Sequence, residues 1–138
     1  MTNLRRGVED EFEGLLSANT GALNGAVARV ARVPQEMILP LVLVSCEVAK
    51  TYSPTLPLYE CSVSITIMTS IADADADEEH QARLSAISDM LDDGEAFALG
   101  ATNQQFECKG LWIDEFSGEP SDNMLVDTIK LKAFCQLI

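Results

Sequence analysis

The segment Asp73–Glu79 carries acidic side chains at four alternating positions, a spacing that resembles the first ligands of a calcium-binding loop. An EF-hand loop also needs glycine at its sixth position and glutamate at its twelfth. Counted from Asp73, the chain has Glu78 and Leu84 there. The pattern therefore indicates the solvated start of a helix, where acids are stabilised by the positive end of the helix dipole.

His80 is the only histidine of the chain and is therefore the first candidate for a general base. A nucleophilic mechanism would need a serine or cysteine placed beside it, and no sequence motif places one. The chain has no GxGxxG, P-loop or HExxH motif. The acid pairs Asp92-Asp93 and Asp114-Glu115 stand at predicted loop edges, where acids are common. We therefore predict no catalytic, metal or cofactor site and no enzymatic activity, with His80 on the first turn of a helix.

The four cysteines are widely separated and form no CxxC pair. A four-cysteine zinc site normally shows close pairs on turns, so we interpret these residues as small buried hydrophobes. Spacing alone leaves disulfides open. The N-terminus lacks an apolar signal region, which favours a reducing cytosol and free thiols. The residues are Cys46, Cys61, Cys108 and Cys135.

Length and composition predict one globular domain over residues 1–138. Hydrophobic residues make up 47% of the chain, which argues against disorder despite a net charge of -13. With 22 acidic residues against nine Lys and Arg, specific nucleic-acid binding is not expected, because duplex affinity depends on cations that neutralise phosphates. No apolar stretch is long enough to span a membrane.

Hydrophobic periodicity predicts an α+β fold in the order α-β-β-α-β-β. The first two strands are joined by a short proline-containing loop and should pair antiparallel. A four-stranded mixed or antiparallel sheet with two helices packed on one face follows, since each helix has one apolar stripe. Residues 22–39 are ambiguous between a turn and a strand. The predicted helices are 3–19 and 73–93. The predicted strands are 41–49, 58–69, 105–115 and 125–137. The longer connections are loops at 52–57 and 95–104 and a turn at 116–123.

Strict alternation divides each strand between two faces of the sheet. All four cysteines fall on the apolar face, and so does Trp112, which we interpret as a core residue. The second face is largely polar, but apolar residues can gather at its ends, and Phe116 follows in an exposed loop. A contiguous apolar patch there would mark an interface. The candidate interface residues are Leu41, Leu43, Met68, Leu111, Ile113, Phe116 and Phe134.

Four segments in order resemble the bacteriophage tail terminator, or tail completion, proteins over most of the chain. They are VEDEFEGLLSA, PLVLVSCEVA, YECSVSITIMTS with the acidic run and helix after it, and FECKGLWIDEF with LVDTIKLKAFCQLI. One departure is the segment 26–35, where many members of the family have a clearer short strand.

The resemblance implies a non-catalytic virion protein, assembled in the host cytoplasm into a hexameric ring at the head-proximal end of the tail tube. Such a ring stops tube polymerisation and contacts both the tube protein and a connector or neck protein. DNA would pass an acidic lumen without binding. A head–tail connector or neck ring is the alternative within this class. A small cytosolic α+β binding module that oligomerises through its sheet is the alternative from another class.

Overall fold

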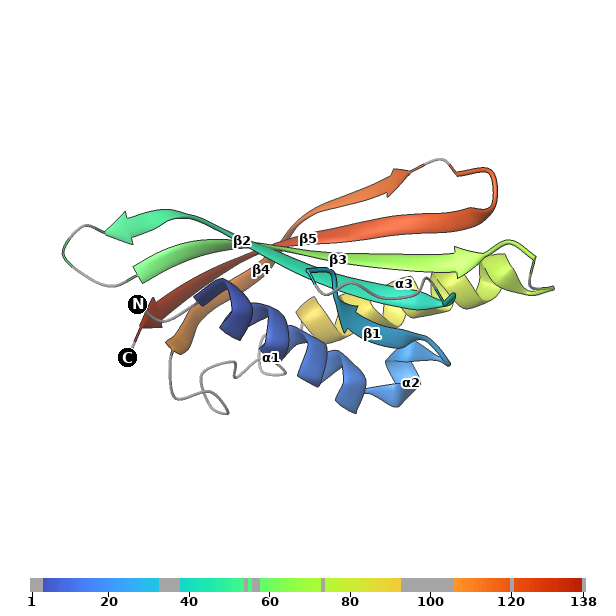
Figure 1. Ribbon diagram of the computed structural model, residues 1–138, viewed down its shortest axis with the longest axis horizontal. Helices are drawn as coiled ribbons and strands as arrows, with labels where there is room; N and C mark the ends of the chain where they lie inside the picture. The colour runs from blue at the N-terminus through green and yellow to red at the C-terminus, as the bar shows by residue number, and fades with distance from the viewer. Residues whose placement is uncertain are drawn as a thin grey trace.

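The computed structural model describes residues 4–32, 38–53, 55, 58–72, 74–92, 106–119 and 121–137. These residues form three helices and five strands (Figure 1). The helices are α1 (Leu4–Ala18), α2 (Thr20–Leu23) and α3 (Ala76–Asp92). The strands are β1 (Val27–Val30), β2 (Leu41–Ser53), β3 (Leu58–Ser70), β4 (Phe106–Glu119) and β5 (Met124–Leu137).

The strands form one mixed sheet in the order β1-β2-β3-β5-β4. β1 pairs parallel with β2, and the other pairs are antiparallel, which confirms the predicted pairing of β2 with β3. The prediction of four strands and two helices is wrong in detail, because α2 starts just after the first predicted helix and β1 lies in the ambiguous segment 22–39. Only four residues of β1 alternate, with Ala28 and Val30 buried, so the period-two pattern is too short to identify from sequence.

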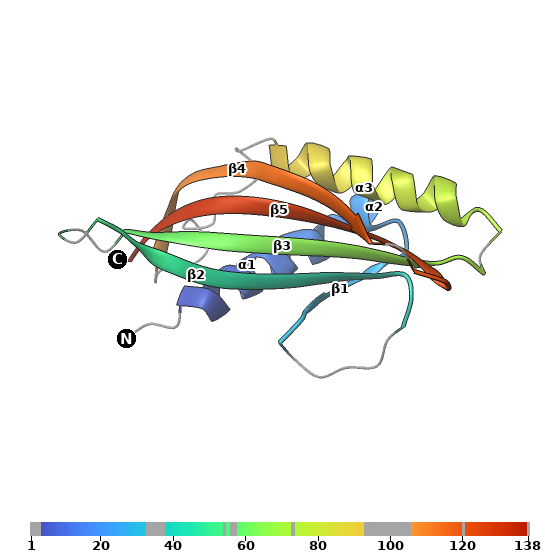
Figure 2. The same ribbon diagram turned by 90° about the horizontal axis from the view of Figure 1, so that it is seen from above.

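The described helices all cover one face of the sheet, and none of them lies on the other face (Figures 1 and 2). α1 packs against β1 and β2, whereas α3 lies over β3, β5 and β4. The predicted apolar face of β3 is confirmed, because Cys61, Val63, Ile65 and Ile67 have no exposed surface. From α1, Val8, Phe12 and Leu16 complete this core.

β4 departs from the strict alternation that the sequence suggested. Register shifts between Cys108 and Gly110 and between Ile113 and Glu115 reverse the faces of the residues between them. Trp112 therefore lies on the outer face, away from the helices, and 45% of its surface is exposed, so its assignment to the core is wrong. Leu111 is opposite Ala133 and Ile113 is opposite Leu131, and both pack against the core instead of facing outward.

The boundaries of several elements also differ from the predicted ones. β4 continues to Glu119 and β5 starts at Met124, so the connecting turn is shorter than 116–123. α3 begins at Ala76, and its first turn contains Asp77, Glu78 and Glu79, as expected for a helix start. The predicted loop at 95–104 lies outside the described residues.

Candidate interaction surface

The outer face of the sheet has a polar centre. In the strand register, Ser45, Ser64, Lys130 and Glu115 form one row across four strands. Lys130 lies 3.8 Å from a Glu115 carboxylate oxygen, and Lys132 in the next row donates to the Ser62 hydroxyl at 2.9 Å. A shallow groove of about 340 Å³ follows these side chains. Charges of both signs line it, so the groove does not attract ions of one sign.

One end of the outer face is apolar but largely closed. Leu41 lies opposite Met68, and Leu43 in the next row lies opposite Thr66. Leu41 and Met68 are only 3% and 6% exposed, so most of their surface is already covered within the chain. Of these three candidate residues, only the half-buried Leu43 offers appreciable surface to a partner.

The other end of the outer face carries an aromatic pair. The ring centroids of Trp112 and Phe134 lie 5.0 Å apart at an interplanar angle of 31°, a geometry typical of stabilising aromatic contacts. Phe134 was among the predicted interface residues, whereas Trp112 was missed. Gly110 is the sequence feature that could have indicated the outward position of Trp112. Glycine inside a strand pattern often marks a bulge, and a bulge reverses the alternation.

The remaining interface candidates face the helical side of the sheet. Leu111 and Ile113 contact the core, as described above. Phe116 is paired with the buried Ile129, yet it lies on the edge strand and is 55% exposed. The seven candidates therefore do not form one patch. Leu41, Leu43, Met68 and Phe134 share the outer face, and Leu111, Ile113 and Phe116 do not.

Both edges of the sheet carry features that hinder the addition of a further strand. β4 has two bulges and charged side chains such as Lys109 and Asp114 along it, features that natural proteins use to block edge pairing. On the other side, β1 covers β2 only as far as Val44. The next edge amide, that of Cys46, is occupied by a side chain of α1. These features hinder strand addition along β4 and along β2 as far as Cys46.

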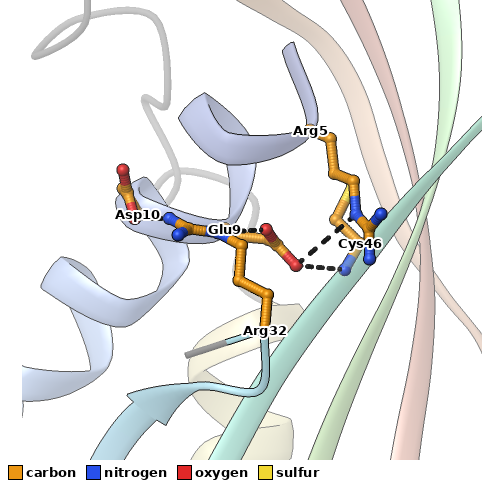
Figure 3. A network of polar contacts seen from close by, with 5 residues as sticks. All are labelled: Arg5, Glu9, Asp10, Arg32 and Cys46. Carbon is orange, nitrogen blue, oxygen red and sulfur yellow. Dashed lines mark hydrogen bonds and ion pairs between the residues drawn. The ribbon is translucent and has the colours of Figure 1, made fainter. Parts of the chain in front are cut away.

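That side chain is Glu9, which has no exposed surface. Figure 3 shows its polar contacts. One carboxylate oxygen accepts the Cys46 amide at 3.1 Å, and the other accepts from Arg32 Nε at 2.8 Å. Arg32 also donates to the exposed Asp10 at 2.8 Å, and Arg5 lies 3.9 Å from Glu9. The buried carboxylate is therefore paired and hydrogen-bonded, as burial of a charge requires. It joins α1 to β2 and to the segment after β1.

A second buried polar chain lies between α3 and the sheet. The Asp127 carboxylate lies 2.7 Å from His80 Nε2, and His80 Nδ1 lies 2.8 Å from the Thr69 hydroxyl. An ionised carboxylate only accepts, so Nε2 carries the shared proton, and in a neutral ring Nδ1 accepts from Thr69. Arg83 donates to Thr69 at 3.1 Å and to the carbonyl oxygens of Leu23 and Asn24 at the end of α2.

Burial limits the chemistry open to the Thr69–His80 pair. Thr69 has no exposed surface and His80 is 1% exposed, so a substrate carbonyl cannot reach the hydroxyl beside the imidazole. A cavity of about 290 Å³ lies beside His80 and Asp127. Its wall includes Gly118, where an added Cβ would lie 3.0 Å from Asp127 Oδ1. His80 lies near the start of α3, as predicted. Its ring connects α3 to Thr69 on β3 and Asp127 on β5.

Two further findings concern the described residues alone. Among them, no group of three or more His, Cys, Asp or Glu side chains is arranged to hold a metal ion. In the same part of the chain, no helix is both long and apolar enough to cross a membrane.

The comparisons with known proteins find likenesses to solved structures. No protein-family model matches the sequence, and no curated protein matches it. The fold is similar to that of a chain in a solved structure of the virion of a native gene transfer agent (GTA) particle, with a TM-score of 0.66 and 17% sequence identity. The match covers 96% of this chain and 95% of the other. At that identity the likeness concerns the fold.

Proposed function

We propose that this chain is a structural protein of a phage-like virion. The observation that carries the proposal is the likeness to the chain from the gene transfer agent virion, which extends over nearly the full length of both chains. A shared fold does not by itself imply a shared function. The proposal is also supported by the tail terminator resemblance of the sequence, which was recognised from different features.

In the finer form of the proposal, the chain assembles into a hexameric ring at the head-proximal end of a tail tube. The ring stops the tube from growing and joins it to the connector or neck. Its contacts are heterologous, so two different surfaces of each copy meet in the ring. The role needs no catalysis, and the buried positions of His80 and Thr69 are compatible with that.

The outer face of the sheet is the best candidate for one of these two surfaces. None of the described helices covers it, and the exposed Trp112 lies there against Phe134. Large aromatic side chains are enriched at the centres of protein interfaces. A head–tail connector or neck ring would use such a face equally well, and so would a small binding module that oligomerises through its sheet.

Deletion of the gene in the phage or transfer element that encodes it separates these candidates. A tail terminator is required to stop tube growth, so we expect abnormally long tubes and heads without tails in electron micrographs. Normal tail length with unjoined heads would favour the connector alternative. Intact, infectious or transducing particles from the deletion strain would contradict the proposal that the chain is a virion component.

A further inference from the structure

The four cysteines lie on four neighbouring strands and form a continuous row on the helical side of the sheet. Cys46 is on β2, Cys61 on β3, Cys135 on β5 and Cys108 on β4. The strand register places each of them opposite or diagonal to the next. All four thiols are free. The row therefore brings four thiol groups together on neighbouring strands.

Only one pair in the row is directly opposite in the strand register. Cys108 faces Cys135 across β4 and β5. Opposite residues of an antiparallel pair have Cα atoms about 4.5 or 5.5 Å apart, and both values suit a disulfide.

The other neighbouring cysteines are offset by two positions in the register. Cys46 is opposite Val63, and Cys61 is opposite Ala133. Diagonal neighbours of this kind have Cα atoms about 7–8 Å apart. A disulfide between them would require the backbone to move.

The two thiols of the opposite pair differ in access and in acidity. Cys108 is half-buried, whereas Cys135 has no exposed surface. The neighbouring Cys135 thiol lowers the pKa of Cys108. The proximity of Cys108 and burial raise the pKa of Cys135. Cys108 is thus the more accessible thiol, and its lowered pKa increases the fraction present as the attacking thiolate.

We propose that Cys108 and Cys135 form a redox modification site, at which a small-molecule disulfide oxidises the two thiols to a cross-strand disulfide. The Cys108 thiolate attacks one sulfur of the reagent disulfide, forms a mixed disulfide and expels one reagent thiolate, which takes up a proton. The Cys135 sulfur then attacks Cys108 Sγ, loses its proton and expels the second reagent thiol. Two protein thiols are oxidised and one reagent disulfide is reduced to two thiols.

The disulfide would fix the start of the edge strand β4 to β5. It would leave Cys46 and Cys61 reduced, because neither has a partner in register. A cross-link between distant parts of the chain restricts the unfolded state, so we expect the midpoint of thermal unfolding to rise by about 5 °C or more on oxidation.

The test treats the folded, full-length protein with glutathione disulfide and follows it by intact mass and by peptide mapping without reduction. We expect loss of two of the four free thiols, no lasting glutathione adduct, and one cross-linked species joining the peptides of Cys108 and Cys135. A stable adduct on Cys108, cross-links to Cys46 or Cys61, or a folded protein whose thiols do not react would overturn the proposal.

Variants provide the matched controls. Cys108→Ser should abolish the cross-link, and Cys135→Ala should stop the reaction at the mixed disulfide on Cys108. Cys46→Ala should form the cross-link as the unmodified protein does. If Cys135→Ala does not fold, the peptide map of the unmodified protein still decides the outcome. A cross-link that persists in a folded Cys108→Ser protein would refute the assignment.

Discussion

Glu9 is the buried charged residue of α1. Its carboxylate occupies the Cys46 edge amide and pairs with Arg32, so one side chain joins three segments. Arg83 has a similar role under α3, where it holds the carbonyl oxygens at the end of α2. In both cases an ionic group is buried with its partners, and removal of one partner leaves the others unsatisfied.

We predict that Glu9→Ala lowers the free energy of unfolding by about 3 kcal/mol, because the Cys46 amide and Arg32 lose their buried acceptor. Urea denaturation followed by circular dichroism measures the change. Asp10→Ala is the matched control, since Asp10 binds the same arginine but its side chain is 62% exposed. That control should cost less than about 1 kcal/mol. Equal losses from the two variants would contradict the role given to Glu9.

Arg83→Met should lower the free energy of unfolding by about 2–3 kcal/mol, since methionine keeps most of the apolar stem but leaves the carbonyl groups of Leu23 and Asn24 without a donor. Hydrogen exchange at the amides of α2 should accelerate in parallel. Glu79→Ala is the control, because that carboxylate is 44% exposed and lies 3.6 Å from Arg83. If Arg83→Met lowers the free energy of unfolding no more than Glu79→Ala does, the network is not needed for stability.

At the scale of elements, the strands with uninterrupted alternation could be predicted from the sequence and the bulged strand could not. β3 alternates without a register shift between Leu58 and Ser70, and its buried face is the predicted one. In β4, two extra residues shift the register by one place each. A one-place shift moves every following side chain to the other face. This explains why Trp112, Leu111 and Ile113 were assigned to the wrong faces.

The same reasoning explains what could be predicted of the candidate surface. Phe134 is on β5, where alternation holds, and it lies on the outer face as predicted. The prediction for Leu41 and Met68 gave the correct face, but alternation does not indicate how much of each side chain is covered. The buried contacts of Glu9 and His80 join residues 37 and 47 positions apart. A pattern within a short stretch of sequence cannot indicate contacts between residues so far apart in the chain.

A pair of adjacent substitutions on β4 tests the bulge. Leu111→Ala should lower the free energy of unfolding by about 2 kcal/mol, because Leu111 packs against the core. Trp112→Ala should cost less than about 1 kcal/mol, since the indole is exposed on the outer face and loses mainly its contact with Phe134. Chemical denaturation measures both. Strict alternation predicts the opposite order, so a larger loss at Trp112 would refute the register described here.

At the scale of the whole molecule, one layer of helices leaves one face of the sheet open, and the net charge of the chain is -13. The charge favours solubility. Assembly into the proposed ring would therefore depend on local complementarity at a limited contact. The aromatic pair on the outer face is the group best placed to supply it, and its removal should affect assembly more than folding.

The central claim is that the protein functions as a ring, and the most direct measurement is the native mass of the purified protein, alone and after incubation with tail tubes from its own virion. We predict a hexamer, either in solution or on tube ends, visible as rings in electron micrographs. Trp112→Ala should reduce the hexamer while the monomer stays folded. A protein that remains monomeric or dimeric in solution and does not bind tube ends would contradict the account.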